Sequence, residues 1–180
     1  MRVLLTLIDP LDLFIETNGE WLYFFLIMAT SLASLFMVFG QRLRRPKDLA
    51  VRRYVWALFG VVIVWITLMA GSLMALALDQ DSSQVLPPLE RFSSVATILF
   101  ILWAFWAADR EHRRKSPDLF LGFGIIAVIA GYVASAFMWH DLAGTMDFNL
   151  SDLGVTWAFI AVVLSTVGFG LILADFKTVV

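Results

Sequence analysis

The 180-residue sequence contains no cysteine. This absence excludes a disulfide framework, a thiolate metal site and a catalytic cysteine. Charged residues are also scarce, because they make up 16% of the chain, whereas soluble domains contain about 25%. The net charge of -2 provides no broad basic field of the kind that attracts nucleic acid. We therefore expect neither a disulfide-rich secreted domain nor a nucleic-acid-binding protein.

Apolar residues dominate instead, since 61% of the chain is hydrophobic and the mean hydropathy is +0.85. A soluble fold of this size cannot hide that much apolar surface, because about a third of the unfolded chain's surface stays wet. Five runs without Asp, Glu, Lys or Arg are suited to crossing a membrane as helices. The third run is short and is extended back to Pro87, since proline is favoured in a first helical turn.

The predicted fold class is all-α, a polytopic membrane protein with a five-helix transmembrane bundle. An outer interfacial segment is predicted at 1–20, and the five-span transmembrane domain covers 21–180. The predicted spans are about 21–40, 54–78, 87–108, 117–140 and 152–175.

Polar residues at the ends of the runs predict where helices begin. Arg45–Asp48 is expected to open the second helix before the membrane is reached. Ser116–Asp118 combines an N-cap, a proline at the first helical position and a first-turn acid before the fourth helix. Ser151 and Asp152 are expected to cap the fifth helix.

Basic residues are concentrated in the loops 41–53 and 109–118, whereas the other loops are acidic. The positive-inside rule places these two loops in the cytoplasm, which puts the N-terminus outside and the C-terminus inside. The expected location is the cell inner membrane, as a multi-pass protein. A basic collar in the first loop is predicted to contact lipid and to determine topology. It consists of Arg42, Arg44, Arg45, Lys47, Arg52 and Arg53.

The uncharged runs carry only hydroxyl and aromatic polar groups, whereas pumps and proton relays place ionisable groups at membrane depth. Thr67, Ser72 and Ser135 are expected to bond to helix carbonyls or across helices, with a polar pocket as the alternative. His112 and His140 fall on opposite sides of the membrane in this topology. They therefore cannot share a haem or another metal. We expect no metal site and no cofactor.

Small residues recur at four-residue spacing in three of the runs. They are Ala127, Gly131 and Ser135 in the fourth, Gly71 and Ala75 in the second, and Ala29 and Ala33 in the first. Small side chains let helix backbones approach closely in lipid. The pattern predicts packing within the bundle, and a homodimer interface is the alternative.

No catalytic motif is present, since the sequence lacks GxSxG, HExxH and a P-loop. We therefore expect no enzyme activity.

A stimulus or ligand is instead predicted to act at the outer ends of the third and fourth helices, which are neighbours if their loop is short. Prolines fix the backbone there, and an acid–base pair, an indole and an imidazole lie at one depth. The hypothesis is one outward cleft lined by Pro87, Pro88, Glu90, Arg91, Trp139 and His140. The alternative is that these polar and aromatic groups contact lipid headgroups.

Three parts of the sequence carry a family resemblance: Asp9–Leu11 with Gly19–Tyr23, Leu86–Arg91 with Ile101–Phe105, and Met146–Asn149. With them the chain resembles the N-terminal membrane module of bacterial multidomain sensor proteins, chiefly histidine kinases with GAF or PAS domains. The resemblance implies a sensory or signal-input module of a two-component system, whose last helix leads into cytoplasmic signalling domains. Any kinase activity would lie in domains outside these residues.

The predicted partners are the lipid bilayer and cytoplasmic output domains or a partner protein, with no nucleic acid. The alternative function is an accessory or scaffold subunit of a larger respiratory or photosynthetic membrane complex, which the aromatic content of 14% suits. A third hypothesis is a small transporter of a lipid or a neutral substrate, because uncharged spans argue against ion transport.

Overall fold

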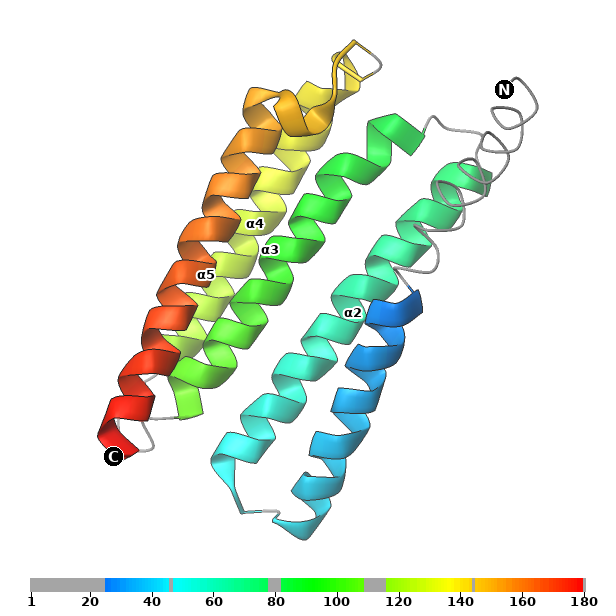
Figure 1. Cartoon of the computed structure of the whole chain (residues 1–180). Helices are drawn as coiled ribbons and strands as arrows, with labels where there is room; N and C mark the ends of the chain where they lie inside the picture. The colour runs from blue at the N-terminus through cyan, green and yellow to red at the C-terminus, as the bar shows by residue number, and fades with distance from the viewer. Residues whose placement is uncertain (1–24, 46, 78–81, 109–115, 144, 180) are drawn as a thin grey trace, which may run out of the picture.

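The structure, a computed structural model, describes residues 25–45, 47–77, 82–108, 116–143 and 145–179. These residues form helices and turns, with no strand among them. The described residues are all-helical, as predicted, and each of the five long helices is long and apolar enough to cross a membrane. The helices are the N-terminal helix Phe25–Arg44, α2 (Leu49–Ala77), α3 (Ser82–Ala108), α4 (Ser116–His140) and α5 (Asp152–Val179), with the short 3-10 helix η1 (Phe148–Leu150) before α5 (Figure 1).

The bundle has two ends of different charge. We call the end with residues 41–53 and the start of α4 the basic end, and the end with η1 and the start of α3 the acid end. The predicted interfacial segment 1–20, the start of the span 21–40 and His112 lie outside the described residues.

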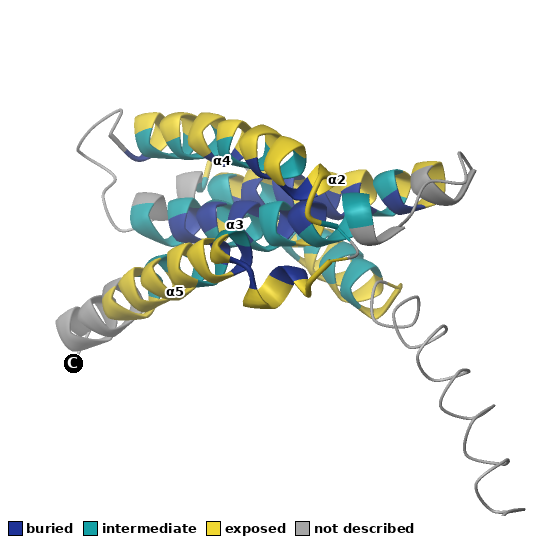
Figure 2. Cartoon of the chain, turned by 90° about the horizontal axis from the view of Figure 1, so that it is seen from above, coloured by how far each residue is buried: buried dark blue, intermediate teal, exposed yellow. Residues whose placement is uncertain are grey.

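Helix α3 forms the centre of the bundle, because it packs against α2, α4 and α5. Figure 2 shows buried residues along α2 and α3, whereas the outer faces of α4 and α5 are exposed. In the membrane-spanning windows, 39% of α2 and of α3 is buried, compared with 11% of α4 and of α5. The exposed faces are apolar, as contact with lipid requires.

Two of the predicted helix starts are confirmed by their hydrogen bonds. Asp48 caps α2, since its Oδ1 accepts a bond from the N–H of Val51 at 3.3 Å. Ser151 caps α5, since its Oγ accepts a bond from the N–H of Gly154 at 3.1 Å. Helix α2 therefore begins at Leu49, before the predicted span at 54.

The predicted start of the third span at Pro87 is wrong as a helix boundary, because α3 begins at Ser82. Pro87 and Pro88 consequently lie inside the helix. A proline nitrogen has no hydrogen to donate, so the carbonyl groups of Ser83 and Gln84 lack their usual helical partners. Pro88 is fully buried, and the next residue, Leu89, packs in the core. Tertiary packing thus outweighs the local preference of proline for a first turn.

Polar and aromatic contacts join α3 to its neighbours at the basic end. The indole Nε1 of Trp103 donates a hydrogen bond to Oδ1 of Asp118 in the first turn of α4 at 2.9 Å. One turn on, the rings of Trp106 and Phe120 meet edge to face at a centroid distance of 5.0 Å. Asp118 therefore stabilises the start of α4 and also holds it against α3.

Candidate functional site

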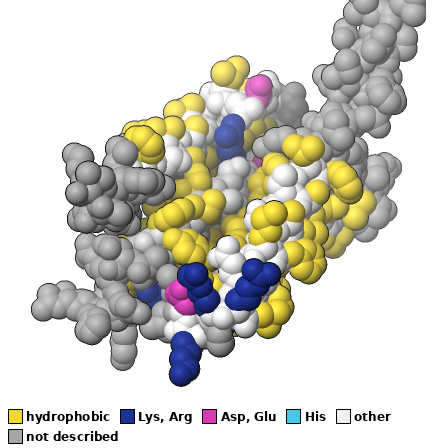
Figure 3. Space-filling view, turned by 60° about the horizontal axis from the view of Figure 1, so that its bottom comes forward, with side chains coloured by type: hydrophobic (Ala, Val, Ile, Leu, Met, Phe, Trp, Pro, Cys, Tyr) yellow, Lys and Arg dark blue, Asp and Glu magenta, His cyan; other side chains and the backbone are white. Residues whose placement is uncertain are grey.

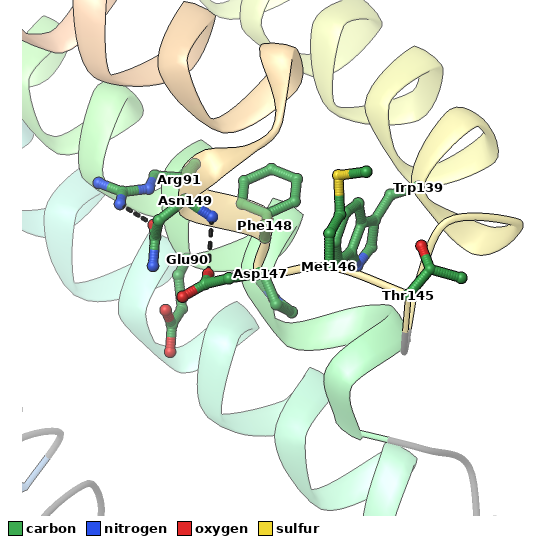
Figure 4. A pocket seen from close by; sticks show the side chains of 9 residues that line it. Glu90, Arg91, Trp139, Thr145, Met146, Asp147, Phe148 and Asn149 are labelled. Carbon is green, nitrogen blue, oxygen red and sulfur yellow. Dashed lines mark hydrogen bonds between the residues drawn. The ribbon is translucent and has the colours of Figure 1, made fainter.

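The acid end carries a pocket of about 390 Å³ between the start of α3, the end of α4 and the segment that leads into η1 (Figure 4). This volume is within the range of sites for small molecules. The pocket combines an apolar floor with acidic, basic and amide groups. Its lining residues are Pro87, Glu90, Arg91, Trp139, Thr145, Met146, Asp147, Phe148 and Asn149.

The polar side of the pocket is held by Asn149. Its side-chain Oδ1 accepts a hydrogen bond from Nη2 of Arg91 on α3, as Figure 4 shows. Its backbone N–H donates to Oδ1 of Asp147 at 2.9 Å, which is the side-chain cap of η1. Asn149 therefore links the guanidinium of Arg91 to the turn before α5, through its side chain on one side and its backbone N–H on the other.

The apolar side of the pocket is held by an aromatic pair. The rings of Trp139 on α4 and Phe148 on η1 meet edge to face, with centroids 4.9 Å apart. Both residues are buried, at 2% and 3% exposure. Such a pair contributes about 1 kcal/mol beyond the burial of its surface. The pair and the Arg91–Asn149 bond together fix η1 to both α3 and α4.

Close backbone packing fixes η1 to α5 as well. The hydroxyl of Ser151 donates to the carbonyl oxygen of Phe148 at 2.6 Å while it caps α5. A Cβ atom on Gly154 would overlap the same carbonyl group, so glycine is needed at this position. Three helices consequently meet at one short segment.

The structure brings together four of the six predicted cleft residues and separates two. Pro87, Glu90, Arg91 and Trp139 line the pocket, whereas Pro88 is buried behind it. His140 is exposed and lines a different hollow, together with Gln84, Tyr132, Phe137 and their neighbours. Trp139 is buried at 2% exposure and lines the pocket, whereas His140 is exposed and does not line it. The role of these six residues in recognising a stimulus stays a prediction, and four of them share one pocket.

The sequence does not predict the residues from Thr145 to Asn149 as site residues, although Met146–Asn149 carries part of the family resemblance. An acid two positions before an asparagine is a signal for a capped turn, because Asp side chains bond to the backbone two residues on. That signal predicts the turn. It does not predict that the turn folds back over Arg91.

The small-residue positions pack within the bundle where their contacts are described. Trp157 of α5 donates a buried hydrogen bond from Nε1 to Oγ of Ser135 at 2.9 Å, and its ring would lie 3.4 Å from a Cβ on Gly131. A Cβ on Gly71 would overlap the side chain of Leu89. Ala127 is exposed and contributes nothing to this contact, and the side chain of Ala75 lies outside the described part.

Hydroxyl groups within the spans mostly bond to their own helix, as expected. Thr67 donates to the carbonyl of Ile63 at 3.0 Å, and Ser72 donates to that of Leu68 at 3.0 Å. Ser93 and Thr97 are the exceptions, since their hydroxyl oxygens are buried and have no hydrogen-bond partner among the described residues. The described residues also contain no group of three or more acidic or histidine side chains that could hold a metal.

The basic collar lies where α2 and the N-terminal helix meet. Figure 3 shows Lys and Arg side chains gathered at this end of the molecule. Arg44, Arg45, Lys47 and Arg52 are exposed, whereas Arg42 and Arg53 are half-buried. Four of the six collar residues therefore present their charge outward.

Comparisons with protein-family models, curated proteins and solved structures find no match for this chain. The resemblance to bacterial sensor modules consequently stays a prediction from the sequence.

Proposed function

We propose that this chain is a membrane-embedded sensory module that receives a signal at its acid end and has no catalytic activity of its own. The observation that supports this function is the pocket closed by Arg91 and Asn149. A polar solute that engages the Arg91 guanidinium competes with the Asn149 amide. Loss of that bond releases η1 from α3, and η1 continues directly into α5.

In this proposal the acid end faces outward and the basic end faces the cytoplasm of a bacterial inner membrane. Helix α5 then carries a displacement of η1 to the cytoplasmic side, where an output domain or partner protein responds. Cysteines placed at Ser82 and Ser116 test the orientation, because these helix starts lie at opposite ends of the bundle. A membrane-impermeant maleimide is expected to label the Ser82 position from outside and the Ser116 position only after lysis. The reverse pattern would overturn the orientation.

The partner is tested in native membranes with a photo-cross-linking amino acid at Lys177, near the end of α5. A kinase or another signalling protein as the cross-linked product supports the sensory function. A respiratory or photosynthetic complex recovered at fixed stoichiometry supports the alternative accessory role instead.

The pocket is tested in the same cells with matched variants. Arg91→Ala and Asn149→Ala each remove one half of the same bond, so both are expected to shift the output of the partner in the same direction. His140→Ala is the control, because His140 lies at the same end of the bundle but outside the pocket. An unchanged output in the two pocket variants, with normal membrane insertion, would contradict the proposal.

A further inference from the structure

A further hollow, called the groove below, lies at the basic end between the N-terminal helix and α2. It has a volume of about 500 Å³. Its walls are apolar and largely aromatic, and two arginines complete its lining. The lining residues are Leu35, Phe36, Phe39, Arg42, Arg52, Val55, Trp56 and Phe59.

The aromatic walls of this groove are open to the surrounding lipid. Phe36 is 72% exposed and Trp56 is 58% exposed. The rings of Trp56 and Phe59 meet edge to face at a centroid distance of 6.0 Å, so this wall has a defined shape. Water does not reach such a surface within a bilayer, and an acyl chain is the natural apolar occupant.

Two arginines give the groove a positive charge. Among the described residues, the guanidinium groups of Arg42 and Arg52 have no hydrogen-bond or ion-pair partner. Asp48, the one acid in residues 41–53, caps α2. Arg42 is half-buried against the apolar groove, as long cationic side chains often are at a membrane interface.

We propose that this groove binds one anionic phospholipid, with its phosphate held by Arg42 and Arg52 and one acyl chain lying along Phe36, Phe39 and Trp56. Basic pockets between transmembrane helices are suited to anionic headgroups. A zwitterionic lipid would bring its own cation beside the two guanidinium groups, so we expect it to bind more weakly than an anionic lipid. A second copy of this face would bring two basic collars together, so like charges disfavour a dimer here. The proposal does not depend on the sensory function.

The affinity is tested by native mass spectrometry of the full chain, with phosphatidylglycerol and phosphatidylcholine of identical acyl chains as probes. We expect one phosphatidylglycerol to be retained per chain in preference to phosphatidylcholine. Arg42→Gln with Arg52→Gln should weaken phosphatidylglycerol binding about thirtyfold, because each charge at an anionic surface contributes about fivefold. Arg44→Gln with Arg45→Gln removes the same charge outside the groove and should weaken it less than about threefold.

Three outcomes would overturn the proposal. Equal losses in the two double variants would mean that the collar attracts lipid without a defined site. Displacement of the lipid by an equal concentration of glycerol phosphate would mean that the site recognises phosphate alone. A dimer without bound lipid would mean that a second chain covers the groove.

A second measurement uses the unaltered protein and so does not depend on the folding of a variant. Phosphatidylglycerol with a photoactivatable acyl chain is cross-linked in liposomes, and the modified residues are mapped by mass spectrometry. Labels are expected on Phe36, Phe39 and Trp56 at least fivefold above those on Phe123. Phe123 is a control of similar exposure, at 70%, that lies on α4. Equal labelling of all these positions would show that the lipid contacts the surface at random.

Discussion

Replacement of Gly154 by alanine is expected to destabilise the acid end, even though alanine favours helices. A Cβ atom at this position would lie 2.8 Å from the carbonyl carbon of Phe148 and 2.9 Å from the Cα of Asn149. Both are backbone atoms of η1, so they cannot swing aside as the end of a side chain can. Alanine in a helix is favoured over glycine by about 1 kcal/mol, whereas overpacking costs about 1–3 kcal/mol. The expected net loss is up to about 2 kcal/mol.

Gly122→Ala provides the matched control, because a Cβ on Gly122 of α4 meets nothing within 4 Å. This variant should gain up to about 1 kcal/mol, since only the helix preference operates there. The assay is steric-trap unfolding of both variants in bicelles. Hydrogen exchange of the Asn149 amide adds a local measurement, because the shift of η1 should weaken its bond to Asp147. A Gly154→Ala protein as stable as the control would refute the close approach of η1 and α5.

Three further predictions concern single hydrogen bonds. Trp157→Phe should lower the unfolding free energy by about 1 kcal/mol, because it leaves the buried hydroxyl of Ser135 without its donor. In a double-mutant cycle, Ser135→Ala should then lower the unfolding free energy of the Trp157→Phe protein only slightly further. Trp103→Phe removes the donor to Asp118 and should therefore speed hydrogen exchange in the first turn of α4. An exchange rate equal to that of the parent protein would show that Asp118 does not hold α4 against α3. Asp48→Ala should cost about 1 kcal/mol through loss of the α2 cap, and Asp48→Asn should restore most of it.

The spans could be predicted from the sequence because the bilayer imposes a length and a composition on each one. The α2 and α5 caps could also be predicted, since Asp48 and Ser151 act on residues only three positions away. The preference of proline for the first helical turn gave the wrong start for α3, because it placed the start at Pro87 whereas the helix begins at Ser82. The extra turn depends on how α3 packs against α2, which no local pattern records.

The pocket was predictable only in part, for two different reasons. Trp139 and His140 are neighbours in the sequence, but Trp139 is buried beside Phe148 whereas His140 is exposed and lines a different hollow. The contact between Arg91 and Asn149 joins residues far apart in the chain, and it depends on the path of the turn between α4 and α5. The sequence therefore predicts at which end of the bundle the pocket residues lie. Only the fold shows that Asn149 bonds to Arg91 and closes the pocket.

The burial of α3 determines which helix can transmit a displacement of η1 in the proposed function. Ser93, Val95 and Ala96 are all at most 1% exposed, and they face different directions because successive helical positions differ by about 100°. A rotation of α3 would therefore disturb several neighbours at once. Helix α5 is far less enclosed, and it begins directly after η1. It approaches α3 closely at Gly168, where a Cβ would lie 2.8 Å from the side chain of Leu102. In the proposed function, α5 would tilt about this contact and carry a change at Arg91 to the basic end while α3 stays in place.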